Sequence, residues 1–86
     1  MPEISLFYGI RVTMYWNDYN PPHFHAEYSS YKAVILIEDG AILEGHLPKR
    51  QLKFVLAWAE IHKDELMQNR ELAKDNKPLM RINPLI

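Results

Sequence analysis

The sequence of 86 residues contains no cysteine. Disulfide bonds, metal sites built from thiolates and a cysteine nucleophile are therefore all excluded. The chain also lacks any run approaching the ~20 apolar residues of a membrane-spanning helix, and its start, Met1-Pro2-Glu3, lacks the basic residues of a signal peptide. We therefore expect a cytoplasmic protein, by default a prokaryotic one, that does not bind a membrane.

An excess of charge of one sign is also missing, since the formal net charge is −1. Bulk attraction to phosphate requires an excess of Lys and Arg, so the composition argues against a protein that holds nucleic acid by charge alone. A local basic patch is still compatible with this net charge. A chain of 86 residues is long enough for one compact core and too short for two, so we predict a single domain over residues 1–86.

Two short segments show the period-two alternation of a half-buried strand. Apolar and polar residues alternate between Ile10 and Trp16, and again from His23 to Tyr28. The intervening stretch, Asn17 to Pro22, carries two Asn, one Asp and two Pro, a composition typical of a turn or loop. We predict that the two segments pair as a hairpin.

A second hairpin is predicted further along the chain. The run from Tyr31 to Glu38 is rich in β-branched and aromatic residues, and Ala41 to His46 supplies the return strand. Between them, Asp39-Gly40 is a pair preferred in tight two-residue turns. This turn would place Ile37 opposite Ile42.

The longest regular segment begins at Pro48. No Gly or Pro follows until after Asn69, and we predict one helix from Pro48 that continues to Asp75-Asn76. One apolar stripe at helical spacing would dock on the sheet. Its members are Leu52, Val55, Leu56, Ala59 and Leu66.

A second apolar group, Phe54, Trp58 and Ile61, falls on roughly the opposite side of this helix. Exposed Trp and Phe are typical anchors of interfaces, so we expect this side to bind a second copy of the chain or another small protein. The alternative is a wide core contacted by the C-terminal arm. Trp16, by contrast, is predicted to be a core residue.

These segments together predict an α+β fold. It would consist of a small antiparallel sheet of about four strands packed on one long C-terminal helix, followed by an extended C-terminal arm. Pro78 and Pro84 restrict this arm to an edge strand or a docked segment.

The candidate functional residues lie on the second predicted strand. Residues two apart on a strand share one face and are ~6.5–7 Å apart along it, so His23, His25 and Glu27 form a row. If the first two strands pair, Arg11 and Tyr15 lie beside this row on the same face. The result is a patch with two imidazoles, a carboxylate, a guanidinium and a phenol.

One interpretation of the patch is metal-free acid–base chemistry on RNA. A ribonuclease of this type needs a base for the 2′-hydroxyl, an acid for the leaving oxygen and a cation for the transition-state charge. His25 or His23 would be the base or the acid. Arg11 would clamp a phosphate and Glu27 would orient an imidazole, and no cofactor is expected.

The same row also permits a metal site. Two His and one carboxylate are the ligands of many zinc and non-haem iron sites, and the two-residue spacing lets both rings reach one ion. His23 and His25 would be two of the ligands, and the carboxylate would come from Glu27 or from Asp18 in the preceding loop. A divalent metal such as zinc is therefore the alternative to metal-free chemistry.

A purely structural role for the histidines is the third interpretation. They would then cover the outer face of the sheet, or the Pro-Pro-His-Phe-His segment would stack its rings to fix the hairpin. His46, at the end of a strand, and His62, at the margin of the helix stripe, are predicted to be structural unless the fold brings them near the row.

The segment from Tyr15 to Tyr28, with its Asn-Pro-Pro-His-Phe-His-Ala core, resembles a family of short prokaryotic proteins known as domain of unknown function 4160. The likeness covers nearly the whole chain, and its other parts are Pro2-Glu3-Ile4, Phe7-Tyr8-Gly9-Ile10, Leu43-Glu44-Gly45, Leu47-Pro48 and Trp58-Ala59. One departure is Tyr19, where the family often has His. This chain therefore has one candidate ligand or proton donor fewer.

The resemblance also implies a biological setting. Members of the family look like companions of a second small protein encoded alongside them, an arrangement similar to a toxin–antitoxin pair. By that analogy the chain would be the toxin-like partner, acting on RNA and silenced by an antitoxin-like protein that covers the patch. The alternative is a non-catalytic homodimer or adaptor whose His-x-His row is structural or binds a metal, and the near-neutral charge favours it.

Overall fold

Strands form the first half of the molecule and helices the second. The computed structural model describes residues 2–85, in which five strands precede two helices. Their bounds are β1 (Glu3–Phe7), β2 (Ile10–Thr13), β3 (His23–Tyr28), β4 (Tyr31–Leu36), β5 (Ile42–Gly45), α1 (Lys49–Ile61) and α2 (Lys63–Lys74). The predicted α+β class is confirmed. The sheet has one strand more than the expected number, because β1 precedes the first predicted strand.

Each strand pairs with the next one in the chain, giving an antiparallel sheet with the order β1-β2-β3-β4-β5. The predicted hairpin between the first two alternating segments is confirmed as β2 and β3. In its register, Thr13 lies opposite His25 and Arg11 lies opposite Glu27. This pairing sets the neighbours of the candidate residues.

The connection between β4 and β5 differs from the prediction. β4 ends at Leu36 and β5 begins at Ile42, so Asp39-Gly40 belongs to a longer loop rather than to a two-residue turn. Ile42 consequently pairs with Ile35, not with Ile37. The loop is longer because Leu36 is the last residue of β4, and its N–H donates to the carbonyl oxygen of Ala41 at 2.8 Å. A separate register shift follows between Val34 and Ile35.

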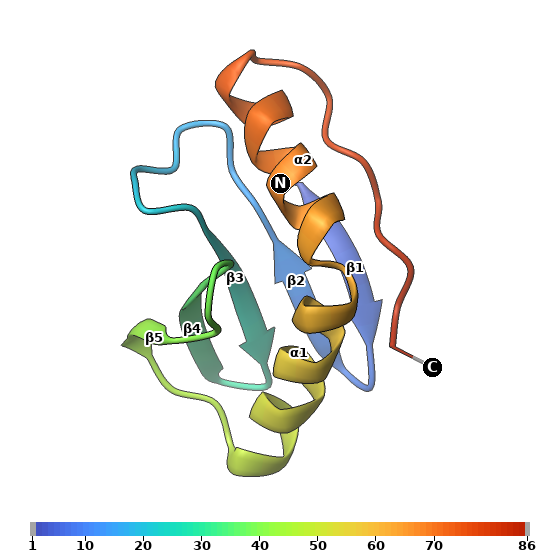
Figure 1. The fold of residues 1–86 in the computed structure, drawn as a ribbon. Coiled ribbons are helices and arrows are strands. Elements are labelled where there is room, and N and C mark those ends of the chain that lie inside the picture. Colours follow the sequence, from blue (N-terminus) through green and yellow to red (C-terminus); the bar gives the residue numbers. More distant parts are fainter. Residues whose placement is uncertain (1, 86) are drawn as a thin grey trace.

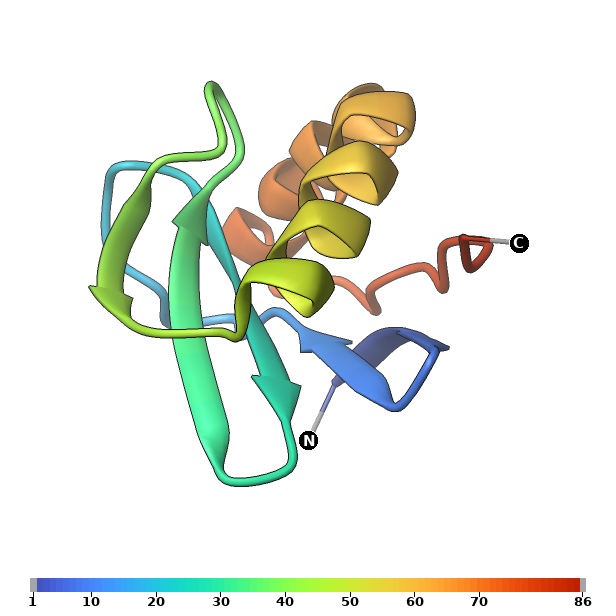
Figure 2. The ribbon, with the colours of Figure 1, turned by 90° about the horizontal axis from the view of Figure 1, so that it is seen from below.

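Both helices lie on the same face of the sheet, as Figures 1 and 2 show. Phe24 and Ala26 of β3 point to this face and are fully buried. Trp58 of α1 meets Phe24 there, with their ring centroids 5.9 Å apart. His25 and Glu27 alternate with these residues and therefore point to the other face, which no helix within residues 2–85 covers.

The predictions for the two tryptophans are reversed. Trp58 is fully buried, and its indole N–H donates a hydrogen bond to the carbonyl oxygen of Asn83 at 2.8 Å. Trp16 is instead 40% exposed. The physical reason is that Trp58 lies on the sheet side of α1, where its ring packs against Phe7 and Phe24, while the C-terminal arm accepts its indole N–H at Asn83.

The expected interface on the helix is corrected accordingly. Of the three residues predicted to bind a second chain, Trp58 is in the core and Phe54 is partly buried against it. Ile61 is exposed. The helix therefore does not present a continuous apolar surface made of these three residues, and the wide core is the interpretation that the burial supports.

The predicted long helix is broken at His62. This residue has φ −107° and ψ 24°, outside the helical range, and its Nδ1 contacts the carboxylate of Glu65. Asp64 and Glu65 occupy the first turn of α2, where acidic residues favour a helix start. The break matters for the site because α2 extends along the sheet to the loop before β3 (Figure 1).

The C-terminal arm is docked, as predicted. The N–H of Ile82 donates to the carbonyl oxygen of Ile4 at 2.7 Å, so the arm follows the outer edge of β1. The side chain of Asn69 accepts from the N–H of Met80 and donates to its carbonyl oxygen, at 2.8 and 2.9 Å. In residues 2–85, neither helix has the length and apolar composition needed to cross a membrane.

Candidate functional site

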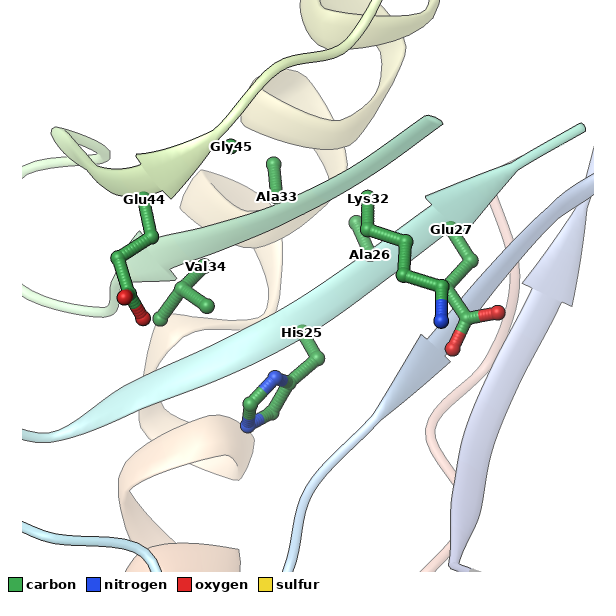
Figure 3. Close-up of a pocket in the computed structure, with 8 residues that line it drawn as sticks. All are labelled: His25, Ala26, Glu27, Lys32, Ala33, Val34, Glu44 and Gly45. Atoms are coloured by element: carbon green, nitrogen blue, oxygen red, sulfur yellow. The ribbon is translucent and has the colours of Figure 1, made fainter. Parts of the chain in front are cut away.

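The open face of β3 carries the predicted row. Figure 3 shows His25, Glu27 and, from the neighbouring strands, Lys32 and Glu44 in front of the sheet, with the helices behind it. These side chains rim a hollow of about 260 Å³. The complete lining is His25, Ala26, Glu27, Lys32, Ala33, Val34, Glu44 and Gly45. The face that was predicted to hold the site is therefore accessible.

The carboxylate closest to the histidines belongs to Asp18. Its two oxygens both lie 3.3 Å from Nε2 of His25, and Oδ1 lies 3.5 Å from Nε2 of His23. Oδ2 also accepts a hydrogen bond from the main-chain N–H of Tyr15 at 3.3 Å. The sequence offered both Asp18 and Glu27 as the partner of the two rings, and the structure places Asp18 there.

Arg70 of α2 holds the loop that carries Asp18. Its guanidinium donates from Nη1 to the main-chain carbonyl oxygen of Asp18 at 3.2 Å, and from Nη2 to the side-chain oxygen of Asn20. Arg70 is buried, and so these hydrogen bonds are shielded from water. The loop is thereby fixed at a position between the sheet and the end of the helix layer.

His23 is oriented by the same loop. Its Nδ1 lies 2.8 Å from the carbonyl oxygen of Pro21, and a carbonyl oxygen can only accept, so Nδ1 carries the hydrogen. Nε2 is buried and has no hydrogen-bond partner among residues 2–85. In the neutral ring this nitrogen carries a lone pair, and it lies 3.5 Å from Oδ1 of Asp18.

Two tyrosine rings flank the cluster formed by Asp18, His23 and His25. Tyr15 packs edge-on against His25, with centroids 4.7 Å apart, and Tyr19 lies over His23 at 5.0 Å. The hydroxyl of Tyr19 donates to the carboxylate of Glu44 at 3.4 Å and is otherwise exposed. Tyr19, where this chain departs from the His that the family often has, therefore lies beside the cluster.

The family comparison covers this whole arrangement. The family model described as Domain of unknown function (DUF4160) matches residues 9–70, a span that begins just before β2 and ends at Arg70. The chain belongs to the DUF4160 family. No curated protein and no solved structure matches it.

Arg11 and Glu27 of this DUF4160 chain form a separate group on the same face. Arg11 of β2 lies opposite Glu27 of β3, two residues along these strands from the pair formed by Thr13 and His25. Arg11 also makes an ion pair with Glu3, with Nε and Oε1 3.4 Å apart. The carboxylate that contacts the His25 ring is that of Asp18, so the orienting role predicted for Glu27 stays a prediction, and the positive charge of Arg11 is partly compensated by Glu3.

Sequence reasoning on the DUF4160 chain missed Arg70. A lone Arg in a helical segment gives no signal of a contact with a loop about 50 residues earlier, and the contact appears only in the folded chain. His46 and His62 lie outside the cluster: His46 packs against Tyr31, and His62, between the two helices, contacts Glu65 in the first turn of α2. Their predicted structural roles stay predictions.

Two kinds of chemistry fit the cluster of the DUF4160 chain. His25 and Asp18 form a carboxylate–imidazole pair, the arrangement that orients a general base. Asp18, His23 and His25 also form the one group of such side chains in residues 2–85 whose donor atoms are all within 4.8 Å of one another. The two uses share the His25 ring: the first needs a hydrogen on its Nε2, and the second needs a lone pair there.

Proposed function

We propose that this chain is the toxin-like component of a two-gene module, and that it cleaves RNA on the open face of its sheet with His25 as the general base. The observation that carries the proposal is the contact of His25 Nε2 with both oxygens of Asp18 at 3.3 Å. The Asp18 carboxylate would accept a hydrogen bond from the Nε2–H of His25, and the lone pair of His25 Nδ1 would then be available to take a proton. The side chain of His25 is 27% exposed, whereas that of His23 is fully buried, so His25 is the ring that a substrate can touch.

The remaining roles go to groups on the same face. His25 would remove the proton of a ribose 2′-hydroxyl, whose oxygen attacks the adjacent phosphorus to give a 2′,3′-cyclic phosphate. Tyr15, in contact with His25, would give its hydroxyl proton to the departing 5′-oxygen. Arg11 would neutralise phosphate charge after exchanging Glu3 for the substrate.

The experiment is an RNA cleavage assay with the purified chain. We expect products that end in a 2′,3′-cyclic phosphate, and we expect His25→Ala to reduce their rate by at least ~100-fold, since a general base contributes about 10²–10⁴-fold. His46→Ala is the matched control, because His46 is exposed and lies outside the cluster. Equal rates for the wild type and His25→Ala, or no cleavage of any RNA, would refute the proposal.

A second candidate is a non-catalytic homodimer, and the observation that favours it is the free edge of β5. All four residues of β5 are exposed, Ile42 and Leu43 among them, while the arm covers the opposite edge at β1. An exposed apolar edge strand is a template for pairing with another strand. Light scattering would show a dimer that Leu43→Lys disrupts, and a wild-type monomer at all concentrations would exclude this candidate.

A further inference from the structure

The buried lone pair of His23 is the feature that the proposed activity leaves unexplained. Its side chain is 0% exposed and its Nδ1 contacts the carbonyl oxygen of Pro21, while its Nε2 has no hydrogen-bond partner in the described part of the chain, residues 2–85. A buried polar atom without a partner destabilises the fold, so such atoms usually face a group that satisfies them. Here the nitrogen faces Asp18 and His25.

The spacing of the three donors matches that of ligands around one ion. Bonds of about 2.1 Å in a tetrahedral site place neighbouring ligand atoms about 3.4 Å apart. Asp18 lies 3.5 Å from His23 Nε2 and 3.3 Å from His25 Nε2. The donor atoms of the two histidines are at most 4.8 Å apart, and the His25 side chain is partly exposed and can adjust to an ion.

We propose that Asp18, His23 and His25 bind one divalent transition-metal ion, of which zinc is the representative. Two imidazole nitrogens with one carboxylate suit zinc and its first-row neighbours, whereas magnesium and calcium prefer oxygen ligands alone. Three protein ligands leave a coordination position open for water or another molecule. That position would be reached from the open face, where Asp18 and His25 are partly exposed.

The groups around the triad are those of an outer coordination shell. A metal-bound histidine usually donates its second ring N–H to a carbonyl or carboxylate, which fixes its tautomer, and His23 does so to Pro21. The N–H of Tyr15 binds the Asp18 carboxylate, and Arg70 holds the main chain of Asp18. The lone pairs are therefore oriented by the fold itself.

This inference goes beyond the proposed activity and does not depend on it. When Nε2 of His25 binds an ion, the ring hydrogen is on Nδ1, and neither nitrogen can accept a proton. The general-base role thus belongs to the metal-free chain. Binding of zinc can be measured whether or not the chain cleaves RNA, so the two ideas can fail separately.

The test is calorimetric titration of the chelator-treated full chain with zinc. We expect one ion per chain, and we expect Asp18→Asn and His25→Gln each to weaken binding by more than ~100-fold, because loss of an outer-shell partner alone costs about 10–100-fold. His46→Gln is the matched control and should bind like the wild type. Asn at position 18 keeps an acceptor for the Tyr15 N–H and leaves the Arg70 contact in place.

Cobalt absorption and nitrogen NMR provide readouts that a merely structural role would not change. Cobalt bound by the triad should give visible bands that Asp18→Asn removes, and zinc should shift Nε2 of both rings while Nδ1 stays protonated. Circular dichroism confirms that each variant is folded. Absence of stoichiometric binding by the wild type, or equal binding by Asp18→Asn, His25→Gln and the wild type, would overturn the proposal.

Discussion

Arg70 donates a hydrogen bond to the main-chain carbonyl oxygen of Asp18 across a separation of 52 residues in the chain. A second hydrogen bond from the same guanidinium reaches the side chain of Asn20. The helix layer thereby positions a residue of the candidate site without contributing a side chain to its chemistry. Because Arg70 is buried, the two acceptors have no ready substitute for it.

Replacement of Arg70 should therefore affect both stability and the site. We expect Arg70→Met to lower the free energy of unfolding by about 2–3 kcal/mol, because hydrogen bonds to charged groups contribute about 1.5–3 kcal/mol. Urea denaturation measures the loss. Lys74→Met, at an exposed position of the same helix, is the control and should stay within about 0.5 kcal/mol of the wild type. Similar midpoints for both variants would show that the clamp contributes little.

The site could be predicted only where its residues follow a local pattern. Alternation along β3 identified the face shared by His25 and Glu27, and the hairpin placed Arg11 and Tyr15 near them. The selection of Asp18 over Glu27 depends on the path of the loop, and that path depends on Arg70. A contact between distant segments leaves no mark in the spacing of either one.

The fold was predictable to a similar extent. Period-two alternation identified β2 and β3, and helical spacing found the stripe around Val55 that docks on the sheet. The reversal of Trp16 and Trp58 has a different origin. The burial of Trp58 depends on which side of α1 faces Phe7 and Phe24 of the sheet and on where the C-terminal arm runs. Pro78 and Pro84 restrict the conformation of this arm but not its location.

Truncation of each tryptophan would measure this reversal directly. Trp58 lies against Phe7 and Phe24, with ring centroids 5.4 and 5.9 Å away. We expect Trp58→Ala to cost about 3–5 kcal/mol of unfolding free energy through lost burial and the cavity left behind. Trp16→Ala should cost only about 1 kcal/mol, mainly the hydrogen bond to the carbonyl oxygen of Lys77. Equal losses in urea denaturation would contradict the burial of these two side chains.

A substitution at position 19 tests the metal proposal through a gain of zinc affinity rather than a loss. Tyr19 lies over His23 at the exposed side of the cluster. We expect Tyr19→His to supply a fourth ligand and to tighten zinc binding by at least ~10-fold, as measured by competition with a coloured chelator. Tyr19→Phe removes only the hydroxyl that contacts Glu44 and should bind zinc like the wild type. No difference between the His and Phe variants would place position 19 outside the coordination sphere.

Zinc should also stabilise the folded chain, because the three ligands come together only when the loop and β3 are in place. An ion that binds the native state alone adds about 2.7 kcal/mol to the unfolding free energy at a free concentration 100 times its dissociation constant. We therefore expect the urea midpoint to rise with zinc and to return on addition of a chelator. Asp18→Asn should show little of this rise, and His46→Gln should show all of it. A rise of the same size in Asp18→Asn would mean that zinc stabilises the chain at some place other than the triad.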